Sequence, residues 1–373
     1  MIVNIQIKDF KCFENESIKL RPLTLLTGTN SSGKSSLIQA LLLCANVEAG
    51  SDMLEYINSL GDFDELKNRY TNPREYEIKI DFDDNSEHIT KSSKDSYPQP
   101  QSQKLTYPTK ITYLNANRNT INETGAISNI FTQNRYFGID GKYISDYFEK
   151  NKGNPIEEYL IQNNNISKTL ETQVNYWLSE ITQHDYQFQT TKLTSNLVKT
   201  SFKMDGFEFK PNNIGAGIGY IATILISCLS ATKENIIMIE NPEIHLHPRS
   251  QAKMGEFLAF IASKGIQLIV ETHNDHLINK IRYEIFKTKL KPDDFIIHYK
   301  TSKTNFEQIF VNEKGFFVDK YGENSFPSGF YDATLQEMAS KRPTDELALS
   351  KVKGVGEVKL KKYSTAFLKI LNS

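Results

Sequence analysis

The sequence predicts an α/β fold, a mixed sheet with flanking helices, and two observations lead to this class. Three largely apolar runs of strand length, at residues 23–26, 236–239 and 268–270, are each followed by a glycine-rich or charged motif. Strands that are buried on both faces, as in parallel sheets, have such continuous apolar runs. Segments whose apolar residues recur every three or four positions, as in a helix, lie between these runs. We therefore expect an α/β head with a helical insertion and a small all-helical C-terminal tail.

The composition is that of an ordinary soluble globular protein. The 373 residues are 39% hydrophobic and 24% charged. The formal net charge of -1 excludes a global field that would draw the chain to nucleic acid or to a membrane, so any basic surface must be local. The three cysteines are too few and too scattered for a disulfide framework or a zinc site. This usage fits a reducing cytosol, and we expect a cytoplasmic protein without a membrane partner.

Residues 1–135 are expected to form the N-terminal lobe of the head. Its strands should alternate apolar and polar residues where one face is exposed, and its turns should be polar. The expected elements, in chain order, are an antiparallel strand pair at 2–10 and 17–20, the buried strand at 23–26 with a helix after it, a turn-rich stretch at 56–66, a strand at 75–82, a mobile polar surface excursion at 83–108 and a strand at 110–114.

The second half of the chain divides into three parts. Residues 136–196 are rich in Asn and Gln and have helical apolar spacing, which predicts a helical insertion. Residues 197–327 are expected to form the C-terminal lobe, which opens with a hairpin at 197–209 around an Asp-Gly turn and continues with a glycine-rich helix start and two buried strands. Residues 328–373 form the predicted helical tail.

A nucleotide-binding motif follows the first buried strand. Residues 28–35 match the pattern G-x-x-x-x-G-K-S/T between an expected strand and an expected helix, and this context is the main test for a P-loop. In such a loop the backbone N–H groups face a phosphate, Lys34 spans the β- and γ-phosphate oxygens, and the Ser35 hydroxyl ligates Mg²⁺. ATP and Mg²⁺ are the expected cofactors. The expected contacts in the loop are Gly28, Asn30, Ser31, Ser32, Gly33, Lys34, Ser35 and Ser36.

Two later strands end in acidic residues. The run 236–240 ends in Glu240, as a Walker B strand requires, and we expect this strand to lie beside the P-loop strand with Glu240 on Mg²⁺. The run 268–270 is followed by Glu271, Thr272 and His273, and this histidine can reach a γ-phosphate. These groups should meet at the carboxyl edge of one sheet, where nucleotides bind in open α/β folds.

Three alternatives stay open at this point. His273 could be a capping or core histidine instead of a phosphate ligand. His245 and His247 could bind a metal ion, although they have no partner cysteines. Arg118 could reach a phosphate or pair with an acid.

The linked motifs resemble those of ABC-type ATPases of the SMC, RecF and OLD kind over about residues 1–330. The similarity is strongest to compact bacterial ATPases with an I-E-N-P-E-x-H-L-H-P box and an E-T-H-S/N-D-H switch. It implies that Glu240 is the Walker B acid and that His273 is the switch histidine. It also implies that residues 242–247 form a D-loop and that residues 213–219 are a diverged signature motif. The apolar run after this motif is then a helix buried in the head.

The resemblance also implies how such a protein works. In the family, two P-loops face two signature motifs across a head-to-tail dimer, so one chain lacks half of each site. We expect this chain to bind and hydrolyse ATP, to form a homodimer through the nucleotide, and to signal to DNA or to an effector, a nuclease encoded nearby, in bacterial anti-phage defence. The alternatives are a RecF-like DNA repair ATPase and a nucleotide-locked scaffold. After His273 no buried strand ends in Asp-x-Asp, so nuclease chemistry is not expected in this chain.

The sequence departs from the family pattern at two places. Asn241 stands where ABC ATPases have a catalytic glutamate, and an amide cannot accept a proton at neutral pH. Hydrolysis is then slow, or Glu243 or Glu271 replaces the base. The usual signature serine is absent, and Gly215 and Gly217 are the candidates for its place.

The tail carries a second resemblance, to the helical HRDC nucleic-acid-binding module of RecQ helicases. Residues 341–373 contain eight Lys/Arg against three Asp/Glu. A tight Gly-Val-Gly turn at 354–356 opens a helix whose N–H groups can receive a phosphate, with lysines nearby. The alternative is a cap that docks protein. The expected DNA contacts are Lys351, Lys353, Gly354, Gly356, Lys359, Lys361 and Lys362.

Overall fold

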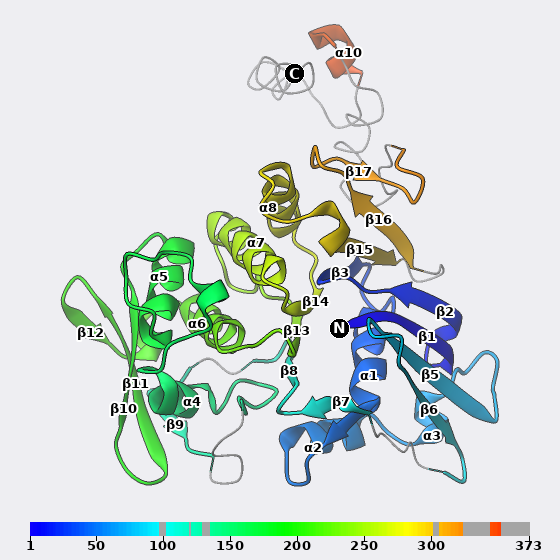
Figure 1. The fold of residues 1–373 in the computed structure, drawn as a ribbon, viewed down its shortest axis with the longest axis horizontal. Helices are drawn as coiled ribbons and strands as arrows, with labels where there is room; N and C mark the ends of the chain where they lie inside the picture. Colours follow the sequence, from blue (N-terminus) through cyan, green and yellow to red (C-terminus); the bar gives the residue numbers. More distant parts are fainter. Residues whose placement is uncertain (97–101, 119–120, 129–134, 301–305, 324–343, 352–373) are drawn as a thin grey trace.

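The computed structural model describes residues 1–96, 102–118, 121–128, 135–300, 306–323 and 344–351. A seven-stranded mixed sheet forms its centre, with the strand order β17-β16-β15-β3-β14-β13-β8 (Figure 1). The five parallel strands are β3 (Leu23–Gly28), β8 (Ile111–Leu114), β13 (Ile236–Glu240), β14 (Gln267–Glu271) and β15 (Phe295–Lys300). β16 (Glu307–Val311) and β17 (Phe317–Val318) add an antiparallel edge. Every residue of the five parallel strands is buried, which explains why their sequences are largely apolar.

The strand order corrects one prediction. β14 pairs with β3 on one side and with β13 on the other, so the strand that ends in Glu240 does not lie beside the P-loop strand. Apolar patterning identifies a buried strand but says nothing of its neighbours. The inserted strand brings Glu271, rather than Glu240, next to the P-loop strand, where it pairs in register with Leu26.

Successive residues of a strand point to opposite faces of the sheet, so alternate residues of the central strands pack into two different cores. Leu268 and Val270 pack into a core with α6 (Ala216–Leu229), α7 (Pro248–Ser263) and α8 (Asp275–Phe286). Ile269 packs on the opposite face with α1 (Lys34–Leu43) and the N-terminal strands. The head therefore has helices on one face of the sheet, and α1 with a second sheet on the other.

The second sheet has the antiparallel order β2-β1-β5-β6 and carries the predicted strand pair. Its strands are β1 (Ile2–Phe10), β2 (Phe13–Lys19), β5 (Glu75–Phe82) and β6 (Glu87–Ser93). The prediction of a mobile excursion at 83–108 was wrong for its described residues, because β6 and β7 (Ser102–Tyr107) lie there, and β7 pairs with β4 (Ala45–Val47). Residues 97–101 of this stretch lie outside the described residues. β6 buries Thr90 and Ser92 and exposes Ile89, so its hydropathy does not indicate a strand.

The stretch predicted to be turn-rich contains two short helices instead. These are α2 (Asp52–Ser59) and α3 (Phe63–Leu66). Asp62 caps α3 in a capping box with Glu65, a signal that the polar composition of this stretch concealed.

The predicted helical insertion is only partly helical. It contains α4 (Ile144–Asn151), the 3₁₀ turn η1 (Glu158–Leu160) and α5 (Leu170–Thr182), but it ends in strand β10 (Gln187–Lys192). β10 pairs with β11 (Leu197–Met204), which forms the predicted hairpin with β12 (Phe207–Phe209) and also pairs with β9 (Thr124–Ala126). Asp205 and Gly206 in the hairpin turn have positive φ, as an Asp-Gly turn requires.

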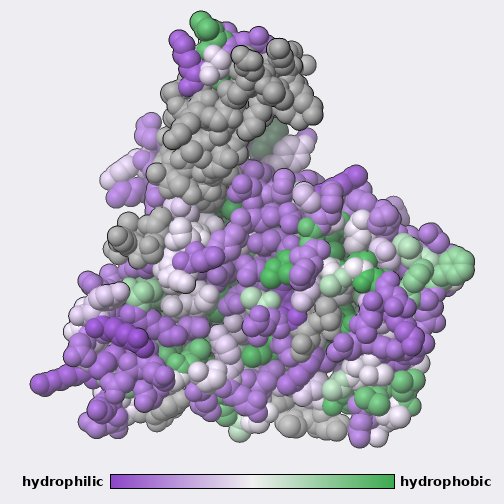
Figure 2. All heavy atoms as spheres, turned by 180° about the vertical axis from the view of Figure 1, so that it is seen from behind, coloured by the Kyte–Doolittle hydropathy of each residue, from purple (hydrophilic) through white to green (hydrophobic). Residues whose placement is uncertain are grey.

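The long apolar run of the sequence is α6, which is buried in the core of the head. Within the described ranges, no helix has the length and apolar character needed to cross a membrane. Figure 2 shows the face opposite to that of Figure 1, where hydrophobic residues among the described ones appear in separate small areas on a largely hydrophilic surface. The remaining short elements are η2 (Pro211–Asn213), η3 (Pro292–Asp294) and α10 (Glu346–Ser350).

Candidate nucleotide site

The loop between β3 and α1 depends on two glycines. Gly28 and Gly33 have φ of 133° and 103°, a region that side chains disfavour. A Cβ on Gly28 would overlap the carbonyl oxygen of Lys300, and one on Gly33 would overlap the sulfur of Cys12. The amide of Thr29 donates to the same Lys300 carbonyl at 3.1 Å, which fastens the loop to β15. The loop shape that the motif predicts is present.

Lys34, the first residue of α1, is buried beneath the loop. Its ammonium nitrogen donates to the carbonyl oxygens of Thr29 at 2.8 Å and Gly28 at 3.2 Å. Its Nζ also lies 3.9 Å from Oε1 of Glu271. Burial lowers the pKa of Lys34, and the nearby Glu271 carboxylate acts against this shift.

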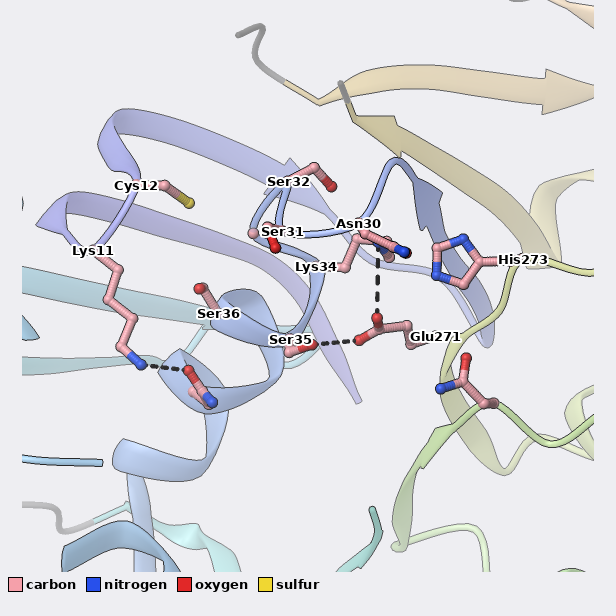
Figure 3. Close-up of a pocket in the computed structure, with 13 residues that line it drawn as sticks. Lys11, Cys12, Asn30, Ser31, Ser32, Lys34, Ser35, Ser36, Glu271 and His273 are labelled. Atoms are coloured by element: carbon pink, nitrogen blue, oxygen red, sulfur yellow. Dashed lines mark hydrogen bonds and ion pairs between the residues drawn. The ribbon is translucent and has the colours of Figure 1, made fainter. Parts of the chain in front are cut away.

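Glu271 is the acid that contacts the P-loop (Figure 3). Its Oε2 accepts a hydrogen bond from the Ser35 hydroxyl at 2.9 Å. Burial raises the pKa of Glu271, and the neighbouring Glu240 carboxylate raises it further. The hydroxyl expected to ligate Mg²⁺ therefore already has a carboxylate partner, from the strand that separates β3 and β13.

Glu240 points its oxygens at other partners. Oε1 accepts from the Tyr113 hydroxyl at 2.9 Å, and Oε2 accepts from the backbone N–H of Ala116 at 3.0 Å. Burial and the Glu240 carboxylate both raise the pKa of Tyr113, so this phenol stays a hydrogen-bond donor. Glu240 lies at the predicted edge of the sheet, and its role as a metal ligand stays a prediction.

The turn after β13 runs close to the end of β14. The N–H of Asn241 donates to the carbonyl of Glu271 at 2.7 Å, and its φ is 46°, a left-handed conformation that asparagine tolerates well. Oε1 of Glu243 accepts from the N–H of His273 at 3.1 Å. Burial raises the pKa of Glu243, whereas burial and the charge of Lys34 lower that of His273, so both groups are held toward their neutral forms.

The loop residues 30–36, together with Asn241, Glu271 and His273, surround one cavity of about 460 Å³, a size that suits a small-molecule ligand. The cavity lining does not include Gly28, Glu240 or Glu243, which were also expected at the site. The lining joins the P-loop to the ends of β13 and β14 and to the turn between β1 and β2. Lys11 and Cys12 were missed by the sequence analysis, because no motif connects that turn to the loop. Gln39 on α1 was missed as well, because it lies beyond the end of the P-loop motif. The lining residues are Lys11, Cys12, Asn30, Ser31, Ser32, Gly33, Lys34, Ser35, Ser36, Gln39, Asn241, Glu271 and His273.

Comparison with known proteins agrees with this geometry. Residues 23–279, more than half of the chain, match the family model described as "AAA domain, putative AbiEii toxin, Type IV TA system". The chain belongs to this family. The AAA domain thus includes the P-loop, both acidic strand ends and His273. This membership supports an ATPase, and with the observed sheet it confirms the predicted α/β class.

Solved structures with a similar fold are distant in sequence. The SMC head domain from Thermotoga maritima is 13% identical, with 83% of this chain and 98% of that chain covered and a TM-score of 0.42. An Smc head domain bound to the C-terminal domain of ScpA derived from Pyrococcus furiosus is 12% identical, with 84% and 96% covered and a TM-score of 0.49. The recombination mediator protein RecF is 10% identical, with 81% and 96% covered and a TM-score of 0.43. No curated protein sequence matches the chain.

The tail has a match of its own. Residues 330–371 match the HRDC domain, which confirms the resemblance seen in the sequence. Lys351 directly follows α10. The other expected DNA contacts, Lys353, Gly354, Gly356, Lys359, Lys361 and Lys362, lie outside the described residues.

The two glycines that the sequence analysis offered for the signature position differ in their surroundings. Gly215 is exposed at the N-cap of α6, and a Cβ there would meet no atom within 4 Å. Gly217 is buried, and a Cβ there would lie 2.6 Å from the carbonyl oxygen of His245. Neither glycine lines the 460 Å³ cavity of its own chain. Gly215 is therefore exposed on the surface of its own chain, while Gly217 lets α6 pack against the turn after β13.

Arg118 has a role that neither alternative anticipated. Its guanidinium donates to the backbone carbonyls of Asn115, Glu240 and Asn241 at 2.6 to 2.9 Å, and so braces the turn after β13. The two histidines of that turn also have structural partners. His245 stacks on Tyr220, and His247 accepts from the N–H of Arg249 as the N-cap of α7.

Proposed function

We propose that the AAA domain binds ATP with Mg²⁺ and hydrolyses it slowly. The observation that carries this proposal is the placement of Lys34 and Ser35 opposite Glu271 and His273 across one cavity. A phosphate-binding cation, a hydroxyl and a carboxylate for Mg²⁺, and a residue at the γ-phosphate end are the parts that phosphoryl transfer needs.

The residues fit a phosphate chain bound in the loop. Gly28 and Gly33 have no side chain, so a ligand can approach the backbone N–H groups of the loop closely. The hydroxyl of Ser32 is buried, lines the cavity and has no hydrogen-bond partner among the described residues. A buried polar atom of this kind is expected to be paired, and a phosphate oxygen would supply the partner.

Each side chain then has a defined task. Lys34 would turn from the loop carbonyls toward the β- and γ-phosphates, and Ser35 would hold Mg²⁺ with Glu271 or Glu240. Mg²⁺ supplies neutralisation of the charge on the phosphates. Asn241 can orient a water molecule but cannot take its proton, which supports slow turnover. Glu243 and Glu271 are the nearby carboxylates that could accept that proton.

We further propose that two copies pair head to tail through ATP and signal to DNA or to an effector. The exposed position of Gly215, away from the cavity of its own chain, supports a site completed by a second copy. The HRDC match supports DNA as a partner. An effector nuclease and a role in anti-phage defence extend this proposal, with a RecF-like repair ATPase as the rival. The genes beside this one would separate the two.

The test of the nucleotide site is the Lys34→Ala variant. The main cation at the phosphates is lost while the glycines keep the loop shape, so we expect ATP affinity to fall by about a hundredfold or more. Isothermal titration calorimetry with ATP and MgCl₂ measures this, and thermal unfolding confirms that the variant is folded. A folded variant that binds ATP as tightly as wild type contradicts the assignment.

A further inference from the structure

Glu271 makes the contacts that the proposed function assigns to the ligand. Its carboxylate accepts from the Ser35 hydroxyl and lies 3.9 Å from the Lys34 ammonium. Those are the hydroxyl that would ligate Mg²⁺ and the cation that would bind the β- and γ-phosphates. Glu271 is only 7% exposed, so its charge is poorly screened by water.

The carboxylate has a physical reason to be there. Lys34 is 3% exposed, and an unpaired buried ammonium is strongly destabilising. Among the described residues, Glu271 is the only acid within 4 Å of that ammonium. Glu271 therefore balances the buried charge of the P-loop.

Glu240 is not placed to do the same. Its two oxygens are taken by Tyr113 and Ala116, and the Tyr113 hydroxyl is in turn 3.3 Å from that of Tyr56. The order of the strands puts β14, and so Glu271, between Glu240 and the P-loop strand. The acid at the P-loop is thus fixed by the fold as well as by hydrogen bonds.

We propose that Glu271 makes ATP binding depend on a divalent cation. Without the cation, the phosphates of ATP must enter beside a buried carboxylate of the same charge and compete with it for Lys34 and Ser35. With Mg²⁺ present, Glu271 and Ser35 would hold the ion, and its positive charge would offset the repulsion between the carboxylate and the phosphates. Glu271 thereby selects the magnesium complex of ATP over the free nucleotide. This inference rests on the proposed function, because it concerns the same site.

The discriminating variant is Glu271→Gln, which keeps the shape and an acceptor for Ser35 but removes the charge. Two like charges a few ångströms apart in a buried site repel strongly, so the variant should bind ATP in EDTA at least about tenfold more tightly than wild type does. In MgCl₂ it should bind no more tightly than wild type. The ratio of the ATP dissociation constants in EDTA and in MgCl₂ is the quantity measured, by calorimetry on the full chain.

Two other variants make the result specific. Glu271→Ala removes the side chain instead of replacing it and must lower the same ratio, which keeps the test valid if the Gln variant does not fold. Glu284→Gln is the matched control, because it neutralises a buried glutamate that pairs with Lys280 and does not line the cavity. It should keep the wild-type ratio.

The possible outcomes separate the inference from the proposed function. If wild type binds ATP in neither buffer, the proposed function fails. If wild type binds ATP but a folded Glu271→Gln or Glu271→Ala protein keeps the wild-type ratio, the function stands and the role of Glu271 is refuted. If Glu284→Gln lowers the ratio as much, the effect does not come from the carboxylate at the P-loop and the inference is equally refuted.

Discussion

At the residue scale, the proposed slow hydrolysis depends on Asn241. It lines the cavity, and its backbone N–H is hydrogen-bonded to the carbonyl of Glu271 at the end of β14. Its φ of 46° suits asparagine better than glutamate, which gives the residue a conformational reason to be present. An amide here supports nucleotide binding without an efficient base.

We predict that Asn241→Glu accelerates ATP hydrolysis by roughly a hundredfold, because a carboxylate would then accept the proton of the attacking water. The left-handed backbone should lower the stability of the variant by about 1 kcal/mol. Single-turnover hydrolysis and thermal unfolding measure the two effects.

Asn241→Gln is the control for that prediction, since it carries the same backbone strain without the carboxylate. It should not hydrolyse ATP faster than wild type. An unchanged or slower Asn241→Glu protein would show that Glu243 or Glu271 already acts as the base, and Gln variants of those two would decide between them.

At the scale of elements, the start of α6 holds both glycines that the sequence offered for the signature position, and the structure distinguishes them. Gly217 is packed on the His245 carbonyl, so a bulky residue there would disturb the contact between α6 and the turn after β13. Gly215 is exposed and faces open space, so it can accept a side chain without disturbing its own chain. If a substitution at Gly217 abolished dimerisation, the cause could be misfolding of the chain itself. A substitution at Gly215 avoids this ambiguity.

We predict that Gly215→Phe abolishes ATP-dependent dimerisation while the chain stays folded and binds ATP. If free heads are monomers, the mass of wild type should double in ATP and Mg²⁺, and that of the variant should not. Light scattering measures the mass. Gly153→Phe is the matched control, because Gly153 is also exposed with open space around it, and it should dimerise normally. A Gly215→Phe protein that pairs on ATP like wild type would refute the composite site.

The same scale shows which elements could be predicted. β3, β13 and β14 were found because burial on both faces makes a strand apolar throughout. β6 was missed because its buried side chains, Thr90 and Ser92, are polar. β10 was missed because no sequence signal for a turn separates it from the preceding helix α5. Both strands are held in place by backbone pairing with a neighbour, β6 with β5 and β10 with β11, and this pairing leaves no signal in their own sequences.

At the scale of the whole molecule, we expect the AAA domain to bind the nucleotide and the HRDC-like tail to bind DNA. The head provides the nucleotide cavity, and residues 330–371 match a nucleic-acid-binding module in a chain whose net charge is only -1. The tail has eight Lys/Arg against three Asp/Glu at residues 341–373, whereas the rest of the chain has 36 Lys/Arg against 42 Asp/Glu. A basic tail on an acidic head would place DNA affinity in the tail.

We predict that charge reversal of Lys359 and Lys361 to Glu weakens DNA binding without changing ATP affinity. Each lost phosphate contact on duplex should reduce the slope of log affinity against log salt by about 0.9, without changing sequence preference. Fluorescence anisotropy with a labelled duplex at several salt concentrations measures this. If the double variant binds DNA with the wild-type slope, the tail docks protein and the groove between paired heads becomes the DNA site to test.

The sequence by itself determined the P-loop, the buried strands and the acids at their ends, because each depends on a few neighbouring residues and on local burial. Only the tertiary structure decided which acid meets the P-loop. That choice depends on the order of β3, β14 and β13, which is set by pairing between strands far apart in the chain and leaves no local signal. For the same reason the different surroundings of Gly215 and Gly217, and the bracing role of Arg118, emerged only when distant segments were brought together.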